Sequence, residues 1–443
     1  MQRLQQLERH LRGTKSKREE VREKNPDDVV IIAAYRTAIT RAGKGKFKDL
    51  NSDELLMKLV TETFKKVKMD PGEIEDVSVG NVLNPGAGVN EHRAAIIAAG
   101  VPAKVPFIAL NRQCSSGLMA VNDIANKIIS DQISCGLAAG VESMSNKYGP
   151  QAAPHISESV KKASEDAKNC MLPMGTTSEN VNDRYDLRRA EQDEFAASSY
   201  QKAERAVKQG LFRDEILPLT IQPKDMEEEE EDDDESGDSG YHKDHHDRGK
   251  KPALPSIVVK DDEGPRPNVT VQSLSKLRPA FKKDGTSHAG NSSQISDGAA
   301  ALILMRRDMA LRLELPILAK YVATTVVGVP PSIMGVGPAY AIPKLLEKTG
   351  ISRDEVEVYE INEAFAGQAL FSIRKVGIPI GKVNPRGGAI ALGHPLGCTG
   401  ARQICTLIRE LQPGDIGITS MCIGGGQGCL LYTSDAADEL DGV

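Results

Sequence analysis

Short apolar runs alternate with amphipathic segments along this chain, and this alternation limits the possible fold more than any other feature. Before residue 145 the pattern predicts four strands and three helices, namely strands 28–39, 76–83, 105–110 and 135–144 and helices 51–66, 91–99 and 115–132. Strands that alternate with helices are typical of a layered α/β fold. A chain of 443 residues is also too long for one simple core.

The same alternation returns after residue 296. It predicts strands 299–304, 317–327, 356–361 and 415–421 and helices 338–348, 364–376 and 399–411. In each half a glycine-containing turn opens a helix, at Ser115 and at Thr399, and a strand then starts near Gly136 or Gly417. We therefore expect two similar α-β-α layered halves.

Residues 146–265 interrupt this pattern and predict an inserted loop region within the first half. They contain one strong helix, 188–209, and an acidic low-complexity run, 227–238, that begins with nine consecutive acidic residues. Such a run repels itself and stays solvated. The remaining boundaries follow: a charged N-terminus at 1–27, a first half at 28–145 and 266–305, and a second half at 306–428.

Composition excludes several classes of function. The net charge of −6 gives no reason to expect nucleic-acid binding, and no apolar run approaches the roughly 18 residues of an integral membrane segment. The seven cysteines form no C-x-x-C pair and are odd in number, so neither a zinc site nor a disulfide framework is expected. His242, His245 and His246 could bind a metal, but a solvated linker is the favoured interpretation and no metal is predicted.

Cys114 lies where a buried strand meets the start of a helix. The small residues Ser115, Ser116 and Gly117 follow it and permit a tight turn with free backbone N–H groups. A thiol at a helix N-terminus faces the positive end of the helix dipole, which favours the thiolate. On position alone, a catalytic cysteine and a buried structural cysteine are equally good interpretations.

Three further stretches place reactive side chains beside glycines or at element junctions. His394 lies in a glycine-rich loop that Pro395 stiffens, and Cys422 lies where a strand runs into a glycine cluster. Asn362 lies at a strand-to-helix junction, where its amide can face a pocket. Each of these signals is weak when it is taken alone.

Taken in order, the stretches 113–117, 362–365, 393–395 and 422–424 resemble the thiolase family, over roughly residues 28–428 without the acidic run. Residues 172–180 are similar to the degradative 3-ketoacyl-CoA thiolases, with Pro173 where biosynthetic acetoacetyl-CoA thiolases tend to carry histidine. The resemblance implies an acetyl-CoA C-acyltransferase of fatty acid β-oxidation that has the thiolase fold. It cleaves 3-ketoacyl-CoA with coenzyme A as co-substrate and needs no bound cofactor.

The resemblance also implies roles for individual residues. Cys114 is the nucleophile, His394 takes its proton, and Cys422 protonates the enolate. Asn362 and His394 form one oxyanion hole, while the backbone N–H groups of Cys114 and Gly424 form the other. Ser292 and Ser293 belong to a segment that lines the coenzyme A channel. His288 departs from the small residue usual in relatives, and we expect a tolerated surface substitution rather than a group that narrows the channel or binds a phosphate.

Four alternatives remain open. An acetyl-CoA C-acetyltransferase or a non-catalytic thiolase-like lipid carrier would share the family. A cysteine hydrolase would not need the second reactive cysteine, Cys422. A decarboxylating ketoacyl synthase shares the fold but typically carries two histidines where this chain has Asn362 and Cys422.

The resemblance further implies a homodimer that pairs through strand 135–144. At the N-terminus, Arg3-Leu4, five residues and His10-Leu11 match the type-2 peroxisomal targeting signal, so we expect a peroxisomal import receptor as a partner. A mitochondrial location is the alternative. At the other end, residues 429–439 match the translation of a sequencing adapter, and we expect 429–443 to be a non-native tail whose first residues mimic the final strand.

Overall fold

A computed structural model describes residues 16–149, 155–223 and 255–434, the last six of these by backbone alone. The targeting signal, the acidic run and His242, His245 and His246 therefore lie outside the described residues, as does the expected disorder of the tail beyond residue 434. In the described part of the chain, no helix combines the length and the hydrophobicity that a bilayer-spanning segment requires.

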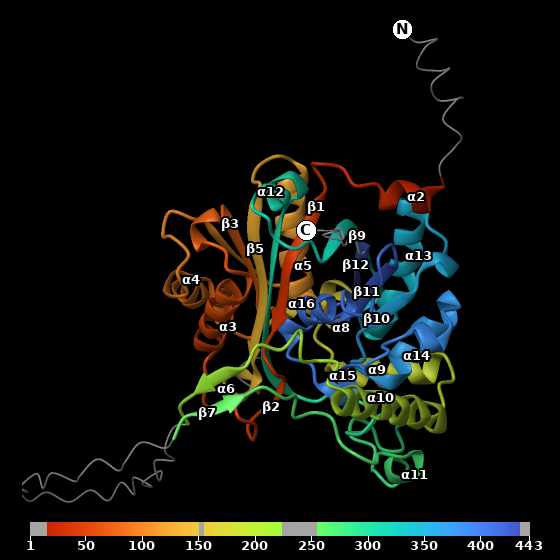
Figure 1. Cartoon of the computed structure of the whole chain (residues 1–443). Helices are drawn as coiled ribbons and strands as arrows, with labels where there is room; N and C mark the ends of the chain where they lie inside the picture. Colours follow the sequence, from red (N-terminus) through yellow and green to blue (C-terminus); the bar gives the residue numbers. More distant parts are fainter. Residues whose placement is uncertain (1–15, 150–154, 224–254, 435–443) are drawn as a thin grey trace, which may run out of the picture.

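One mixed sheet runs through the whole molecule (Figure 1). Its strand order is β10 (Val358–Ile361), β11 (Ile416–Ile423), β12 (Gln427–Ser434), β9 (Ala319–Gly328), β1 (Val29–Arg36), β8 (Ser296–Arg306), β5 (Cys135–Ser143), β3 (Asp76–Gly80) and β4 (Phe107–Leu110). The short strand β2 (Thr40–Arg41) pairs with β8 off this path.

The sheet contains the same strand arrangement twice. In the first half β1 pairs antiparallel with β8, β8 antiparallel with β5, and β5 parallel with β3. In the second half β9, β12, β11 and β10 follow each other in the same order and with the same directions. Pairing of Val30 with Lys320 and of Ile31 with Ala319 joins the halves. The two similar halves expected from the sequence are thus present.

Long helices cover the sheet at positions close to those expected. They are α3 (Ser52–Val67), α4 (Val89–Ala98), α5 (Ser116–Ile129), α10 (Arg189–Gln209), α13 (Gly337–Thr349), α14 (Ala366–Val376) and α16 (Leu396–Leu407). The helix expected at 399–411 begins three residues earlier, directly after Pro395, which is its N-cap. The remaining α-helices of the described residues are α2 (Lys17–Arg22), α6 (Met144–Lys147), α7 (Glu158–Ala163), α8 (Glu165–Asn169), α9 (Met174–Arg184), α11 (Val271–Leu274), α12 (Arg307–Arg312) and α15 (Ala389–Leu392).

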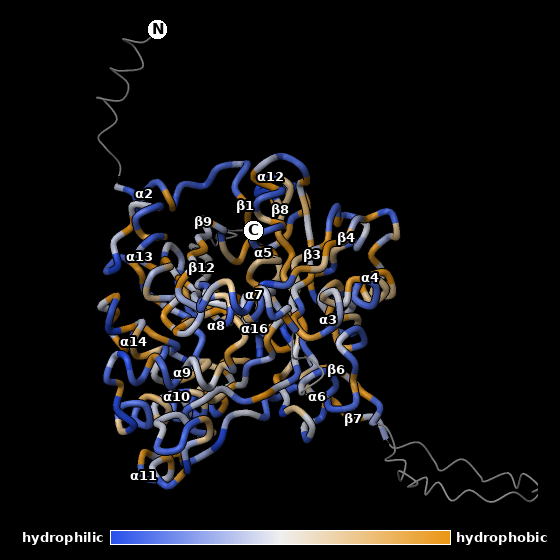
Figure 2. Tube along the Cα trace, turned by 180° about the vertical axis from the view of Figure 1, so that it is seen from behind, coloured by the Kyte–Doolittle hydropathy of each residue, from blue (hydrophilic) through white to orange (hydrophobic). Residues whose placement is uncertain are grey.

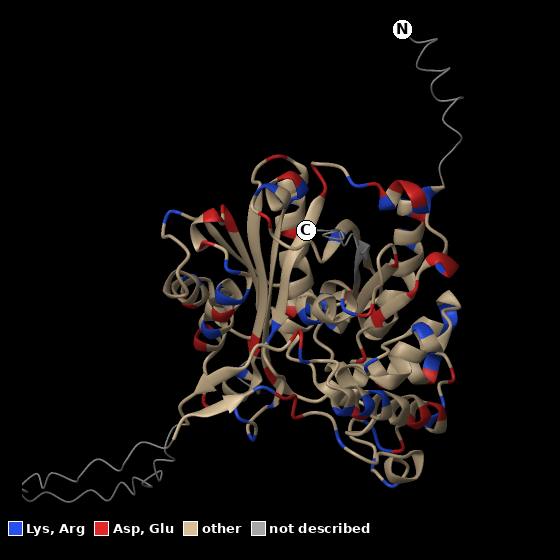
Figure 3. Ribbon diagram, in the orientation of Figure 1, with Lys and Arg blue, Asp and Glu red and all other residues tan. Residues whose placement is uncertain are grey.

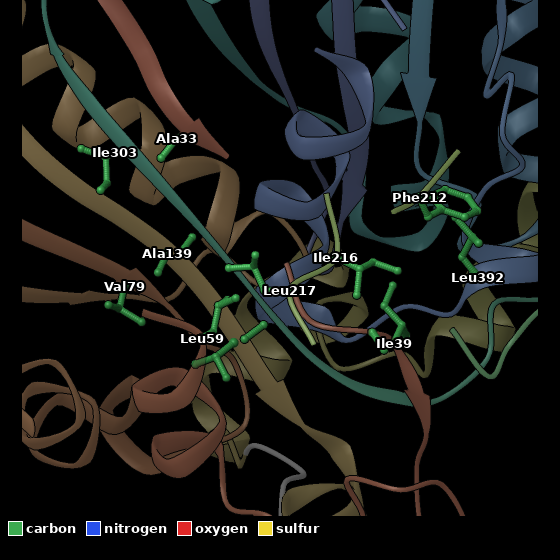
Figure 4. Close-up of a cluster of buried hydrophobic side chains, with 14 of the residues drawn as sticks. Ala33, Ile39, Leu59, Val79, Ala139, Phe212, Ile216, Leu217, Ile303 and Leu392 are labelled. Carbon is green, nitrogen blue, oxygen red and sulfur yellow. The ribbon is translucent and has the colours of Figure 1, made fainter. Parts of the chain in front are cut away.

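Strand β8 shows why the central strands are apolar on both faces. Ala299, Ala301 and Ile303 belong to one buried cluster, and Figure 4 shows Ile303 and Leu59 of α3 among its members. Leu302 and Leu304 belong to a second cluster, which also contains residues of α5 and α16. Helices therefore cover both faces, and successive side chains alternate between two cores. Hydrophobic residues accordingly concentrate inside the molecule in Figure 2, whereas the peripheral α2 is hydrophilic.

Strand β5 lies inside the sheet, between β3 and β8, and all nine of its residues are buried. The expectation that strand 135–144 pairs with a second subunit is therefore wrong, because both of its edges are already hydrogen-bonded within the chain. The strand order was not visible in the sequence. The edges of the sheet are β4 and β10, and β4 directly precedes the Cys114 turn.

The inserted region contacts both halves, because its helices lie beside the second half while Thr220 of its hairpin accepts a hydrogen bond from Lys58 of α3 in the first. Helices α9 and α10 contact α14 in Figure 1 and through close residue pairs. The hairpin of β6 (Leu219–Ile221) and β7 (Ile257–Val259) flanks the acidic run. Figure 3 shows charged residues mainly on the outer helices and loops, while the long central strands are largely uncharged between their ends.

Candidate active site

Cys114 lies on a tight turn between β4 and α5. Gln113, which precedes it, has a left-handed backbone with φ of +48°. The hydroxyl of Ser116 donates to the carbonyl of Gln113 at 2.6 Å and accepts the backbone N–H of Arg112 at 2.9 Å. These bonds hold the strained residue and fix the cysteine directly before the helix.

The Cys114 thiol is buried, and burial raises its pKa to about 11. Hydrogen bonds from the backbone N–H groups of Gly424 and of Cys114 itself oppose this rise but do not outweigh it. Burial therefore disfavours the thiolate more strongly than the helix terminus and these N–H groups favour it. The thiol needs a base. The two N–H groups that reach the sulfur are those expected to form an oxyanion hole.

His394 is a neutral imidazole in one defined tautomer. Its Nδ1 lies 2.6 Å from the hydroxyl of Thr399, and that hydroxyl donates its own proton to the carbonyl of Pro395 at 2.8 Å. Nδ1 must therefore be the donor, which leaves the lone pair on Nε2. Burial and, secondarily, the charge of Arg402 lower the pKa of His394 to about 3. An unprotonated Nε2 suits a proton acceptor.

Asn362 follows β10 and lies against His394. Its Nδ2 is 3.3 Å from Nε2 of His394, and its backbone N–H donates to the carbonyl of Ser420 at 2.8 Å. Its Oδ1 is buried and has no hydrogen-bond partner among the described residues. Burying such an oxygen unpaired is costly, so the atom is available to a water or a substrate group.

Cys422 lies near the end of β11 and is fully buried. Burial and, to a smaller extent, the charge of Cys114 raise the pKa of its thiol well above the ordinary value. The electrostatic effect indicates that the two sulfurs are neighbours. Met334, Ala364 and Phe365 pack around Cys422. The structure thus links Gly424 to Cys114 and Asn362 to His394, and Cys422 lies on the strand that leads into Gly424.

The helices α5 and α16 bring the two catalytic turns close to each other. A Cβ atom on Gly117 would lie 2.5 Å from the carbonyl oxygen of Gly397, and one on Gly140 would lie 2.3 Å from the same oxygen. Real Cβ atoms do not approach oxygen so closely, so only glycine permits this contact. The approach sets the separation of Cys114 and His394.

Sequence reasoning missed Glu142, a fully buried carboxylate near the end of β5. It accepts N–H groups of Asn81, Val82 and Leu83 in the first half and of Gly397 in the second, at 2.9 to 3.2 Å. Burial raises its pKa to about 7, although these donors oppose the rise. An acid within an apolar strand was the signal that could have identified it. Thr399 was also missed as a partner of His394.

The segment expected to line a coenzyme A channel also reaches the site. Ser293 donates its backbone N–H to the carbonyl of Ala364 at 3.0 Å, and Ser292 pairs with Phe365 in an isolated bridge. The hydroxyl of Ser292 is buried without a hydrogen-bond partner among the described residues. His288, in contrast, is not on the surface as expected: it is fully buried and bonded to Asp193, because the chain folds inward before Gly290.

No group of three or more potential metal-binding side chains occurs within residues 16–149, 155–223 and 255–434. The site is instead built from two thiols, an imidazole, an amide and backbone N–H groups. This donor set suits the chemistry of an acyl thioester.

Comparison with known proteins gives a consistent result over nearly the whole chain. The thiolase N-terminal domain family matches residues 29–308, and the thiolase C-terminal domain family matches residues 315–433. A peroxisomal 3-ketoacyl-CoA thiolase of Yarrowia lipolytica is 55% identical over 407 residues, which cover 91% of this chain and 92% of that protein. A Saccharomyces cerevisiae protein of the same name is 51% identical and covers 96% of this chain and 98% of its own length.

Solved structures agree with this result. The dimeric peroxisomal thiolase of Saccharomyces cerevisiae superposes with a TM-score of 0.84 at 52% identity, covering 94% of this chain and all of that chain. Human mitochondrial 3-ketoacyl-CoA thiolase in complex with CoA superposes with a TM-score of 0.77 at 32% identity, covering 93% of this chain and 98% of that chain.

Proposed function

The chain belongs to the thiolase family, and on that premise we propose that it is a 3-ketoacyl-CoA thiolase of fatty acid β-oxidation. It cleaves 3-ketoacyl-CoA with coenzyme A and releases acetyl-CoA and a shortened acyl-CoA. The observation that carries the proposal is the meeting of a protonated Cys114 thiol, a neutral His394 and a second thiol, Cys422, at one buried site.

The first half of the reaction follows from the protonation states. Nε2 of His394 takes the thiol proton of Cys114, and the resulting thiolate attacks the 3-keto carbon. His394 and Asn362 stabilise the negative charge on that oxygen. The C2–C3 bond then breaks, which leaves an acyl thioester on Cys114 and the enolate of acetyl-CoA.

Cys422 completes the cycle as a proton carrier. It gives its proton to C2 of the enolate, whose thioester oxygen is held by the N–H groups of Cys114 and Gly424. The Cys422 thiolate then takes the thiol proton of a second coenzyme A. The coenzyme A thiolate attacks the acyl thioester and forms the new acyl-CoA. His394 returns its proton to the departing Cys114 sulfur, which restores the resting thiol and the neutral imidazole. The high pKa of Cys422 suits proton transfer to a strongly basic enolate.

The binding partners follow from the same proposal. Ser292 and Ser293 contribute to the coenzyme A channel, since their segment lies against Ala364 and Phe365. The enzyme acts as a homodimer that pairs through the exposed edge of β4, whose Ile108 is 37% exposed. An edge strand presents unpaired backbone groups to a second copy.

The enzyme acts in the peroxisome, as the names of the most similar relatives indicate for those proteins. An import receptor that binds the Arg3-Leu4 and His10-Leu11 signal is the partner we propose for targeting. A reporter fused to residues 1–30 should become punctate and peroxisomal, and diffuse or mitochondrial fluorescence would exclude this targeting.

Thiolysis assays test the function directly. The purified full-length chain should consume short, medium or long 3-ketoacyl-CoA only when coenzyme A is present, and should form acetyl-CoA in equal amount. Activity restricted to acetoacetyl-CoA would favour an acetyl-CoA C-acetyltransferase. Absence of activity on every chain length would contradict the proposal and favour a lipid carrier.

A further inference from the structure

His288 is fully buried, and both of its ring nitrogens make hydrogen bonds. Nδ1 accepts the backbone N–H of Gly290 at 3.0 Å, so this nitrogen carries no proton. Nε2 therefore carries the proton of a neutral imidazole and donates it to Oδ1 of Asp193 at 2.6 Å. The ring links the turn at residues 288–290 to the interior of helix α10.

Asp193 is itself held from a second side. Arg189 donates from Nε to Oδ2 of Asp193 at 2.8 Å and from Nη2 to the carbonyls of Leu274 and Leu277 at 3.0 and 2.9 Å. Burial opposes ionisation of Asp193, but hydrogen bonds from His288 and Arg189 outweigh it and keep its pKa below the ordinary value. Asp193 is thus a charged anchor in what we term the Arg189–Asp193–His288 cluster.

A short run of backbone bonds leads from this cluster to the active site. The backbone N–H of His288 donates to Oδ1 of Asn291 at 2.7 Å, which closes the turn. The segment that follows then holds both catalytic loops through bonds from Ala366 N–H to the Asn291 carbonyl at 2.9 Å, from Ser293 N–H to the Ala364 carbonyl at 3.0 Å and from His394 N–H to the Gln294 carbonyl at 2.9 Å. Segment 291–294 therefore fixes the backbone of His394 and the chain just after Asn362.

We propose that His288 is a positioning residue for the reaction. Together with Asn291, whose Nδ2 donates to the same Oδ1 of Asp193 at 3.2 Å, it anchors segment 291–294 to Asp193 and so sets the placement of His394 and Asn362, which face the 3-keto oxygen. This inference rests on the proposed function. The ring bonds to Asp193 and Gly290, so it acts through other residues. Small displacements of catalytic groups are costly, because an error of about 1 Å can lower a rate about 100-fold.

Two amide variants separate the roles of the two ring nitrogens. His288→Gln places a donor where Nε2 reaches Asp193, whereas His288→Asn retains an acceptor near Nδ1 but is too short to reach Asp193. We expect H288Q to keep kcat within about 3-fold of the wild type. H288N and His288→Ala should lower kcat about 10- to 100-fold while KM for both substrates changes less than about 3-fold.

The measurement is steady-state thiolysis by the full-length enzyme, with thermal unfolding of each variant recorded in parallel. Wild-type kcat in H288A, equal losses in H288Q and H288N, or an effect confined to KM would overturn the inference. If H288A does not fold, the comparison of H288Q with H288N decides alone.

Failure of the proposed function would look different, because the wild type would then thiolyse no 3-ketoacyl-CoA. In that event the rate at which iodoacetamide alkylates Cys114 still reports the placement of its base, His394. H288Q should match the wild-type alkylation rate and H288N should be slower. Equal rates in the two variants would overturn the positioning role independently of the substrate.

Discussion

The Nδ1 nitrogen of His394 lies 2.6 Å from the hydroxyl oxygen of Thr399, a residue one helical turn further along the chain. Because the hydroxyl proton is already donated to the carbonyl of Pro395, this contact fixes the imidazole proton on Nδ1 and the lone pair on Nε2. Thr399 therefore determines which nitrogen can act as the base.

Replacement of Thr399 tests this relationship. Thr399→Val removes the acceptor and leaves a buried Nδ1–H unpaired, so we expect kcat to fall about 10- to 100-fold. Thr399→Ser keeps the hydroxyl and should retain most of the activity. Steady-state thiolysis measures both. Equal activity in T399V and T399S would show that the hydroxyl does not control the tautomer.

Replacement of Cys114 and of Cys422 should block different steps of the reaction. Cys114→Ala should form no acyl-enzyme, because no other group carries the acyl chain. Cys422→Ser should leave Cys114 acylatable but slow turnover about 10²- to 10⁴-fold, since the serine is a poorer proton carrier. Mass spectrometry of trapped intermediates and thiolysis rates separate the two. Substantial thiolysis by C114A would contradict the mechanism.

Buried, neutral His394 should lower the free energy of unfolding at acidic pH. Its pKa is lowered to about 3 in the folded state, so below the ordinary value near 6.5 the unfolded chain binds a proton that the folded chain does not. The wild type should therefore lose about 2 kcal/mol relative to His394→Gln between pH 7 and pH 5. Urea unfolding at fixed protein concentration measures the difference. If the difference in unfolding free energy between the wild type and H394Q did not change with pH, the pKa of His394 in the folded protein would be close to its ordinary value.

The edge of β4 should control assembly. Ile108→Lys places a charge on the exposed edge strand and should shift the dimer towards monomer in sedimentation equilibrium. Ile380→Lys is the matched control, because Ile380 is 52% exposed and lies outside the sheet. If the dimers of both variants dissociated, or those of neither, the dimer interface would not lie at the edge of β4.

The sequence could suggest the candidate catalytic residues because each of them lies in a short, local pattern. The sequence alone shows that small residues follow Cys114 at the start of a helix and that His394 lies in a glycine-rich loop. The roles of both residues came from the family resemblance. Glu142 was missed because its four N–H partners lie in two segments, at 81–83 and at Gly397, that are far from it in the chain. His288 was misplaced on the surface because its partner, Asp193, is 95 residues away in the chain.

By itself the sequence determined the local elements and the repeated halves of this protein, since the spacing of apolar residues records which face of each strand and helix is buried. Only the tertiary structure decided the strand order, which places β5 inside the sheet and leaves β4 at its edge. It also decided the protonation states of Cys114 and His394. The free-energy cost of burying a charge depends on every element packed around it, and these elements come together only when the chain has folded.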